Sequence, residues 1–333
     1  MEKINVLIIS SIDELCKEEI KAVSSRINLI DGTHIWDARH ILTGNEKNAY
    51  SKDLDLLLSK AEIIYGRRPP PNMISRAPGV KWFQSFLAGV DHFMDDELIK
   101  SHIKITNMSG FHTCVAETVL SIILMFAKNA PFCIENRRLK KWVRYDPSSV
   151  EGASVGIIGL GKIGKITARL CKSFGMKVHG TKRSAKKGDT ARYVDMIYPI
   201  KDLNILLSSC DFIVSILPAT KETDRMFGEK EFKDMKKSAF FINMGRGNAV
   251  DEAALVKALS KGWIAGAGLD AYETEPLPKE SKLWDLPNVI MFPHVSGRMK
   301  DYEQNINRLF CENLDRYIHG KRLKNLVNKK KGY

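Results

Sequence analysis

Short apolar runs alternate with amphipathic stretches along most of the chain. In the first third, the runs that predict strands cover residues 5–9, 62–66, 81–86 and 103–108. After the first of these runs, residues 12–25 (IDELCKEEIKAVSS) carry apolar side chains at the spacing of a helix face. Strands that alternate with helices are typical of a parallel α/β sheet. The pattern therefore predicts a first α/β domain.

A second series of strands follows a long apolar helix, which is predicted over residues 115–129. A polar stretch with Trp142 and Tyr145 leads from this helix to a turn at Gly152. The strands of the second series are predicted over residues 154–159, 177–181, 195–198, 211–217, 239–243, 265–270 and 288–292. The apolar positions of residues 301–320 share one face, which predicts a final helix. The chain shows no internal repeat.

Length and composition fit a protein of two ordinary globular domains. The chain has 333 residues, of which 44% are hydrophobic and 27% charged. Its net charge of +13 favours anionic partners, such as nucleic acid, an acidic membrane or a phosphorylated small molecule, or serves solubility alone. The longest apolar run, residues 119–127, is far shorter than the roughly 20 residues that span a bilayer.

The cysteines bear on the cellular compartment. The chain has 6 of them, at positions 16, 114, 133, 171, 210 and 311. None forms a C-x-x-C pair or lies at metal-ligand spacing from another cysteine or histidine, so we predict no metal site and no disulfide framework. The apolar part of the N-terminal segment MEKINVLIIS is too short for a secretory signal. The sequence therefore predicts a cytoplasmic protein.

Residues 159–164 (GLGKIG) match the glycine pattern G-x-G-x-x-G. The pattern is weak alone, but here an apolar strand precedes it and a helix follows it. The apolar side chains of that helix, from Ile163 to Phe174, share one face, and Gly175 stands where a glycine commonly ends a helix. We predict a βαβ unit in which Gly161 lets the backbone approach a pyrophosphate at the helix N-terminus.

The residues after the second strand of this unit indicate which dinucleotide binds. An NAD site commonly has a carboxylate about 20 residues after the glycines. Residues 181–187 (TKRSAKK) stand there instead, and Lys182, Arg183 and Ser184 offer two cations and a hydroxyl. Such donors suit the 2′-phosphate of NADP(H). We expect NADP(H) to be preferred and NAD(H) to be possible, and the alternative is a solvated lysine-rich turn in an NAD enzyme.

Further motifs complete a resemblance to a known family. They are VAETVLSIIL, NMGRGNAVDEAALVKALSKGWIAGAGLDAYETEPLP and NVIMFPHVSG. With the glycine loop, they make the chain resemble the D-isomer-specific 2-hydroxyacid dehydrogenases over nearly its whole length. The resemblance implies two doubly wound parallel-sheet α/β domains with a cleft between them. The implied domains are a flavodoxin-like substrate domain (residues 1–106 and 298–333) and a Rossmann nucleotide domain (residues 107–297).

Reduction of a 2-keto acid needs a hydride at C2, a proton for the carbonyl oxygen and a cation for the carboxylate. Arg246 lies between two glycines that leave room for its planar guanidinium. His294 follows the strand 288–292, at the edge where open α/β sheets bind ligands, and can donate a proton near neutral pH. Glu275, with Glu273 as a rival, could raise the pKa of that imidazole. By resemblance, Arg246, Glu275 and His294 match the family's catalytic arginine, acid and histidine.

The resemblance also assigns binding residues. Leu87, Ala88 and Gly89 match a loop whose backbone N–H groups hold the substrate carboxylate, together with Arg246. Asp270 matches a residue near the nicotinamide carboxamide. The residues expected at the cofactor are Gly159, Gly161, Lys162, Ile163, Gly164, Lys182, Arg183, Ser184, Leu217, Pro218, Thr223, Met244, Gly245, Asp270, His294 and Gly297.

Several residues depart from the family pattern or suggest an interface. Arg67 and Arg68 lie in the segment GRRPPP near the expected cleft, and His112 stands where relatives often have Asn. An extra cation could favour a dianionic or phosphorylated keto acid, whereas the alternative is a solvated, proline-stiffened loop. Trp142 and Tyr145 lie in a segment that crosses to a second subunit in relatives, although a simple packing role is equally consistent with their residue types.

The sequence therefore predicts a D-2-hydroxyacid dehydrogenase that prefers NADP(H) and reduces a small 2-keto acid of the glyoxylate or hydroxypyruvate class. Within enzymes, the alternative is an NAD-dependent D-3-phosphoglycerate dehydrogenase. Outside enzymes, the alternatives are an NAD(P)-sensing regulator like the family's corepressor branch and a nucleic-acid-binding protein, for which the chain shows no recognised motif. The expected partners are the small acid and a second copy of the chain, without nucleic acid or membrane.

Overall fold

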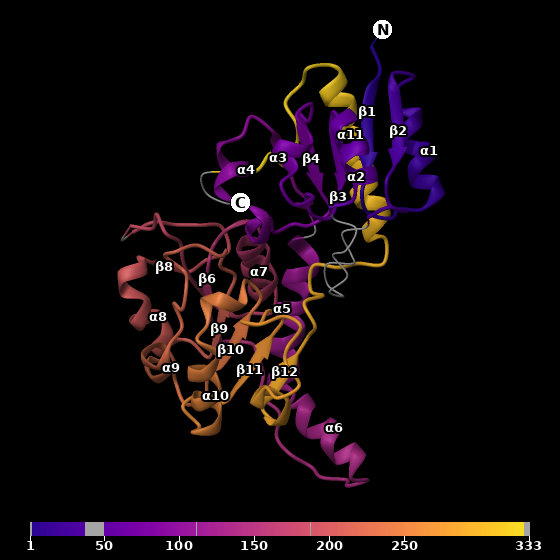
Figure 1. Ribbon diagram of the computed structural model, residues 1–333. Helices are drawn as coiled ribbons and strands as arrows, with labels where there is room; N and C mark the ends of the chain where they lie inside the picture. Colours follow the sequence, from indigo (N-terminus) through magenta and orange to yellow (C-terminus); the bar gives the residue numbers. More distant parts are fainter. Residues whose placement is uncertain (1, 37–49, 111, 187, 330–333) are drawn as a thin grey trace. The chain divides into compact units, whose positions relative to one another are not determined.

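The chain folds as two α/β units, each built on one parallel sheet (Figure 1). The computed structural model describes residues 2–36, 50–110, 112–186 and 188–329. The first unit comprises residues 1–110 and 299–333, and the second comprises residues 111–298. The predicted fold class, two doubly wound parallel-sheet units, is confirmed.

The first unit contains a five-stranded sheet in the order β2-β1-β3-β4-β5. Its strands are β1 (Ile4–Ile8), β2 (Ile27–Asp31), β3 (Ile63–Gly66), β4 (Trp82–Ser85) and β5 (Lys104–Thr106). All neighbours pair in parallel, and the order is that of flavodoxin-like folds. The four predicted strands are present. The sequence analysis missed β2, because this edge strand buries only its first residue and lacks a long apolar run.

Helices cover both faces of the first sheet. They are α1 (Glu14–Ala22), α2 (Lys52–Lys60), α3 (Met73–Arg76), α4 (Asp96–Lys100) and α11 (Tyr302–Ile318). Helix α11 comes from the far end of the chain and packs by aromatic contacts. Its Phe310 stacks on Tyr65 with ring centroids 3.9 Å apart, and the Tyr302 hydroxyl donates to the Phe86 carbonyl at 2.8 Å. The predicted C-terminal helix therefore belongs to the N-terminal sheet.

The second unit contains a seven-stranded parallel sheet in the order β12-β11-β10-β9-β6-β7-β8. Its strands are β6 (Ser154–Ile158), β7 (Lys177–Thr181), β8 (Met196–Tyr198), β9 (Phe212–Ser215), β10 (Phe240–Asn243), β11 (Gly266–Leu269) and β12 (Val289–Met291). The strand order reverses between β6 and β9, as in Rossmann folds, and ligands of such sheets bind beyond the carboxyl ends of the strands at this point. All seven predicted strands are present.

Two buried apolar clusters flank this sheet, one beneath each layer of helices. The helices are α5 (His112–Ala127), α6 (Ala130–Arg138), α7 (Lys162–Ser173), α8 (Leu203–Ser209), α9 (Glu229–Asp234) and α10 (Glu252–Ser260). Short 3-10 helices cover Asp91–Phe93 in the first unit, and Ile200–Asp202, Gly247–Ala249 and Lys282–Asp285 in the second. Because helices cover both faces, the central strands β6 and β9 are buried throughout, which explains their continuous apolar runs.

Helix α6 was missed by the sequence analysis, which expected only a polar stretch after α5. None of its residues is buried, so its sequence has no apolar face that periodicity would reveal. In Figure 1 it extends away from the sheet of its own unit. Among the described residues, no single helix has the length and apolar character to cross a membrane. Only α5 and α6 taken together reach those limits, and they meet at a bend of 65°.

Candidate active site

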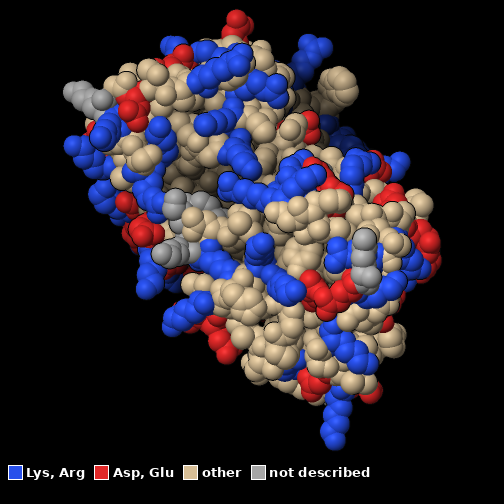
Figure 2. Space-filling view, turned by 90° about the horizontal axis from the view of Figure 1, so that it is seen from above, with Lys and Arg blue, Asp and Glu red and all other residues tan. Residues whose placement is uncertain are grey.

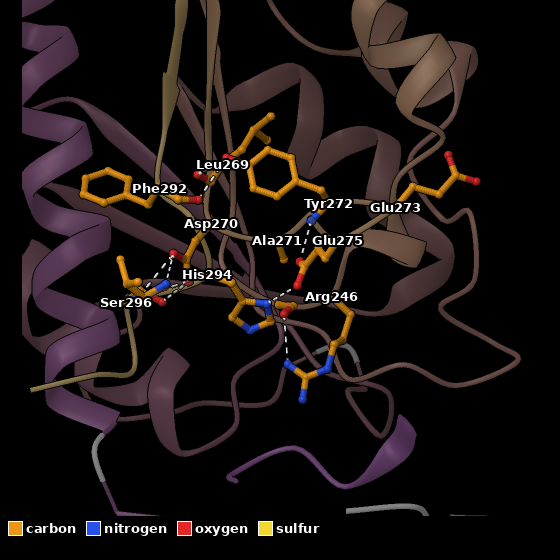
Figure 3. A network of polar contacts seen from close by, with 12 residues as sticks. Arg246, Leu269, Asp270, Ala271, Tyr272, Glu273, Glu275, Phe292, His294 and Ser296 are labelled. Carbon is orange, nitrogen blue, oxygen red and sulfur yellow. Dashed lines mark hydrogen bonds and ion pairs between the residues drawn. The ribbon is translucent and has the colours of Figure 1, made fainter. Parts of the chain in front are cut away.

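Three predicted site residues follow three neighbouring strands of the second sheet. Arg246 comes after β10, Asp270 directly after β11, and His294 after β12. Because β10, β11 and β12 are parallel and adjacent, their carboxyl ends lie at one edge of the sheet. Figure 3 shows the side chains of Arg246 and His294 on the same side of these strand ends. Residues that are far apart in the sequence are thus brought together.

His294 and Glu275 form a close pair at this edge. The His294 Nδ1 atom lies 2.7 Å from Glu275 Oε2, and the two side chains are 47% and 35% exposed. The hydrogen bond that Glu275 accepts from the imidazole raises the pKa of His294, because the carboxylate stabilises the imidazolium. Burial opposes ionisation of Glu275, but its hydrogen bonds with His294 and the Tyr272 N–H lower its pKa overall. The pair therefore favours a protonated histidine beside an ionised carboxylate.

The two candidate acids have different partners. Glu273 pairs through Oε1 with Arg225 Nη2 at 2.7 Å, and in Figure 3 its side chain points away from His294. Glu275 is the residue that bonds the imidazole. Of the two carboxylates that the sequence offered as partners of His294, the structure therefore places Glu275 at the imidazole.

The backbone of His294 has an unusual conformation, with φ of +53°. This left-handed region is uncommon for residues other than glycine. Asp270, which is 2% exposed, braces the following residues by accepting hydrogen bonds from the N–H of Val295 at 2.8 Å and of Ser296 at 3.2 Å. The Ser296 hydroxyl also donates to Asp270. The buried carboxylate thus holds the loop that presents His294.

Arg246 lies on a tightly fitted loop. Its Nη1 donates to the Gly245 carbonyl at 3.1 Å, and its charge acts on both His294 and Glu275. A Cβ atom on Gly247 would lie 1.7 Å from the Tyr272 carbonyl oxygen, so only glycine permits this approach. The Arg246 loop is therefore packed directly against the segment that carries Glu275.

The glycine-rich segment forms a tight turn from β6 into α7. Gly159 has φ of +111°, and a Cβ there would lie 2.6 Å from the Ile216 carbonyl oxygen. A Cβ on Gly164 would lie 2.2 Å from the Gly159 oxygen, which allows the helix to approach the strand. Gly161 is the N-cap of α7, and nothing lies within 4 Å of a Cβ placed on it. The turn thus leaves open backbone at a helix N-terminus, which fits a pyrophosphate.

The end of β7 carries the groups expected for the adenosine ribose. Thr181 Oγ1 is buried and has no hydrogen-bond partner within the described residues. Lys182 Nζ lies 3.5 Å from Asp189 Oδ2, while Arg183 and Ser184 are exposed. Lys187, the last residue of the predicted basic segment, lies outside the described residues. The two cations and the Ser184 hydroxyl fit a 2′-phosphorylated ribose, whereas the Thr181 hydroxyl is fully buried.

The loop after β9 contains further residues that were expected at the cofactor. Leu217 and Pro218 are half-buried there. The Thr223 hydroxyl donates to the Pro218 carbonyl at 2.6 Å and accepts from the Thr220 N–H at 3.0 Å, so it holds its own loop together. Ser215 Oγ, at the end of β9, is buried without a partner among the described residues.

In the first unit, the loop Leu87–Gly89 follows β4. The Leu87 N–H donates to Ser85 Oγ at 3.0 Å, so this amide is already engaged. The Ala88 carbonyl accepts from Asn107 Nδ2 at 2.6 Å, which fixes the peptide orientation. Within the described residues, the N–H groups of Ala88 and Gly89 have no acceptor. Of the three N–H groups expected to hold a carboxylate, those of Ala88 and Gly89 therefore remain as candidates.

The arginine-containing loop after β3 is hydrogen-bonded to the same region. The Ser85 hydroxyl donates to the Arg67 carbonyl at 3.0 Å, and the Phe86 N–H donates to the Gly66 carbonyl at 2.9 Å. Burial and the charge of Arg67 lower the pKa of Arg68, while Asp91 opposes this shift. Two guanidinium groups thus repel each other on a loop held against the start of the Leu87–Gly89 segment.

His112 begins helix α5 and is half-buried. Burial, and then the charge of Lys162 in the glycine loop, lower its pKa, so the imidazole is neutral near pH 7. Two other residues of the site were missed by the sequence analysis, namely Tyr272 and Ser296. Their side-chain hydroxyls contact groups on other strands or loops, and no local sequence pattern indicates such contacts.

Comparisons with known proteins agree on one family. The model of the D-isomer specific 2-hydroxyacid dehydrogenase NAD-binding domain matches residues 120–296. Glyoxylate reductase from Thermococcus litoralis is 35% identical over 271 residues, which cover 77% of this chain and 80% of that protein.

Solved structures give the same result over nearly the whole chain. A D-isomer specific 2-hydroxyacid dehydrogenase family protein from Aeromonas salmonicida superposes with a TM-score of 0.83 at 30% identity, covering 98% of this chain and 100% of that one. An NADPH-dependent glyoxylate/hydroxypyruvate reductase from Sinorhizobium meliloti, solved with NADP and sulfate, gives 0.79 at 26% identity and covers 99% and 100%.

Proposed function

The chain belongs to the D-isomer specific 2-hydroxyacid dehydrogenase family, and we propose that it reduces a 2-keto acid of the glyoxylate or hydroxypyruvate class with NADP(H). It is an oxidoreductase that acts on the CH–OH group of a 2-hydroxy acid. The observation that carries the proposal is the 2.7 Å contact between His294 Nδ1 and Glu275 Oε2 beside Arg246. This pair lies at the ligand-binding edge of a sheet that also presents a dinucleotide loop.

The chain's own residues would supply the proton and the positive charge, and NADPH, when bound, would supply the hydride. Because Nδ1 of His294 is engaged by Glu275, its Nε2 is the atom that donates a proton to the carbonyl oxygen of the substrate. Glu275 keeps the imidazole protonated and oriented. Arg246 orients the substrate carboxylate and polarises the carbonyl through its guanidinium. The N–H groups of Ala88 and Gly89 serve as further carboxylate donors.

The preference for NADP(H) rests on the end of β7. Lys182, Arg183 and Ser184 offer two cations and a hydroxyl to a 2′-phosphate, and the sequence has no carboxylate at the position where an NAD site commonly carries one. The Sinorhizobium meliloti relative was solved with NADP. NAD(H) remains usable, because the glycine loop serves both cofactors.

A second candidate substrate is favoured by one observation. Arg67 and Arg68 place two like charges on a loop beside the carboxylate-binding segment. A substrate with a second anionic group, such as the one used by a D-3-phosphoglycerate dehydrogenase, would relieve their repulsion. The similarity to curated glyoxylate reductases supports the smaller, singly charged acid as the first choice.

We propose that the second unit serves as the nucleotide domain and the first as the substrate domain, and that two chains form a homodimer in the cytoplasm. Trp142 is 93% exposed, and Ile134 and Leu139 are also exposed on α6 and the segment after it. Such apolar exposure is typical of a subunit interface. Figure 2 shows lysine and arginine side chains over much of one face, with acidic side chains among them.

A rate panel tests the proposed function. The purified chain is assayed with NADPH and NADH against glyoxylate, hydroxypyruvate, pyruvate and phosphohydroxypyruvate. We expect NADPH to give a higher kcat/KM than NADH, and glyoxylate or hydroxypyruvate to lead the panel. A clear lead for NADH would refute the assignment of Lys182 and Arg183, and no turnover of any keto acid would refute the reaction. A lead for phosphohydroxypyruvate would select the second candidate.

A further inference from the structure

Tyr272 contacts Glu275 directly and also contacts Phe292, two residues before His294. Its hydroxyl donates to the Phe292 carbonyl at 2.9 Å and lies 3.3 Å from the Leu269 carbonyl oxygen. Its backbone N–H donates to Glu275 Oε1 at 3.0 Å. Figure 3 shows these contacts together, with Tyr272 between the strand ends and the carboxylate.

These contacts restrain the residues on both sides of the His294–Glu275 hydrogen bond. Phe292 precedes His294 by two residues, so a bond to its carbonyl restrains the peptide that leads into the histidine. The backbone N–H of Tyr272 restrains the Glu275 oxygen that does not bond the imidazole. A single residue therefore sets where the carboxylate and the imidazole lie relative to each other. We propose that Tyr272 is a positioning residue whose hydroxyl maintains the His294–Glu275 bond and thereby the proton affinity of His294.

The backbone conformation of His294 explains why the residues before it need to be held in place. With φ of +53°, the residue lies in a sparsely populated conformation that its surroundings must maintain. Asp270 braces the residues after His294 by accepting from Val295 and Ser296. Tyr272 braces the residues before it through the Phe292 carbonyl. The histidine is therefore held from both directions along the chain.

The Tyr272 hydroxyl is suited to a constant role as a donor. Burial, followed by the charges of Asp270 and Glu275, raises its pKa, so the phenol stays protonated at every pH at which the enzyme works. The Tyr272 carbonyl is the group that approaches Gly247 next to Arg246. Each of these contacts is with a neighbouring protein group. The residue acts through His294, Glu275 and the Arg246 loop rather than on the reacting atoms.

Loss of the hydroxyl has a defined electrostatic consequence. A looser contact with Glu275 stabilises the imidazolium less, so the pKa of His294 falls. Reduction of a keto acid requires the protonated histidine, and its rate is lost as pH rises through that pKa. The alkaline limb of the kcat profile therefore moves to lower pH. The KM for NADPH stays the same, because Tyr272 is not a cofactor-binding residue.

The test uses Tyr272→Phe, which removes one oxygen atom and keeps the backbone N–H. Tyr317→Phe is the matched control, because its hydroxyl also makes one half-buried hydrogen bond, to Glu62 in the first unit at 2.6 Å. The histidine titrations of both variants and the wild type are followed by NMR in the full chain, with His294→Gln to assign the signal. The measurements are made well below the melting temperature of each variant.

We expect the His294 titration midpoint of Tyr272→Phe to fall by about 0.5 pH unit or more, and kcat at neutral pH to fall about tenfold. The control keeps the wild-type midpoint and kcat even where its Tm is lowered. A Tyr272→Phe midpoint equal to that of the wild type overturns the proposal, whatever the rates. The kinetic arm rests on the proposed function, whereas the NMR arm does not. A shifted midpoint in a chain without keto-acid reductase activity would therefore support the role of Tyr272 while refuting the function.

Discussion

The carboxyl edges of the two sheets carry different chemistry. The edge of the first sheet offers the Ala88 and Gly89 N–H groups and two arginines, none of which changes charge near neutral pH. The edge of the second sheet carries His294, whose protonation changes in that range and is tuned by Glu275. Under the proposed function, the first edge would select the substrate and the second would perform the proton transfer.

The supporting structure of the two edges differs in the same way. In the first unit, backbone hydrogen bonds between neighbouring loops hold the start of the Leu87–Gly89 segment. One example is the bond from the Phe86 N–H to the Gly66 carbonyl. In the second unit, side chains reach between strand ends, as Tyr272 does toward Phe292 and Asp270 toward Ser296. A side-chain network can tune a pKa, whereas backbone donors mainly fix shape. His294 thus lies in a network of side chains that can shift its pKa.

Removal of the proton donor gives the largest expected effect and tests the second edge. His294→Gln should lower kcat for keto-acid reduction by roughly 10²- to 10⁴-fold, the usual contribution of a general acid, with little change in Tm because the side chain is half exposed. His319→Gln is the control, since His319 caps α11 in the first unit and its side chain is 58% exposed, compared with 47% for His294. Stopped-flow NADPH oxidation measures both. A kcat within a few fold of wild type would contradict the role of His294.

Removal of the cations after β7 should have the next largest effect. Lys182→Ala combined with Arg183→Ala removes two charge-assisted contacts to the 2′-phosphate, and we expect kcat/KM for NADPH to fall about 10- to 100-fold. The value for NADH should stay within twofold, because NADH lacks that phosphate. Lys201→Ala with Lys237→Ala, two lysines of the same unit outside the glycine loop and the basic segment, is the matched control. Equal losses with both cofactors would indicate a general electrostatic effect.

Much of this arrangement can be predicted from the sequence, because it depends on local patterns. The buried strands have continuous apolar runs, and the glycines of residues 159–164 permit the tight turn between β6 and α7. The edge strand β2 and the exposed helix α6 escaped detection because neither buries a regular face. Tyr272 escaped for another reason. Its hydroxyl partner, Phe292, lies 20 residues away directly after β12, and only the folded sheet brings them together.

The smallest expected effect tests the first edge. Arg68→Gln removes one of two mutually repelling guanidinium groups without touching the second unit. If the first edge selects the substrate, the ratio of kcat/KM for phosphohydroxypyruvate over glyoxylate should fall about 3- to 10-fold, as expected for one partly solvent-screened contact to an anion. The alkaline limb of the profile of kcat against pH should stay at the same pH, because His294 and Glu275 are unaffected. Arg26→Gln, which removes a half-buried arginine at the opposite end of the first unit's strands, is the control. A shift of the pH limb in Arg68→Gln would show that the two edges are electrostatically coupled and that selection and proton transfer are not separable.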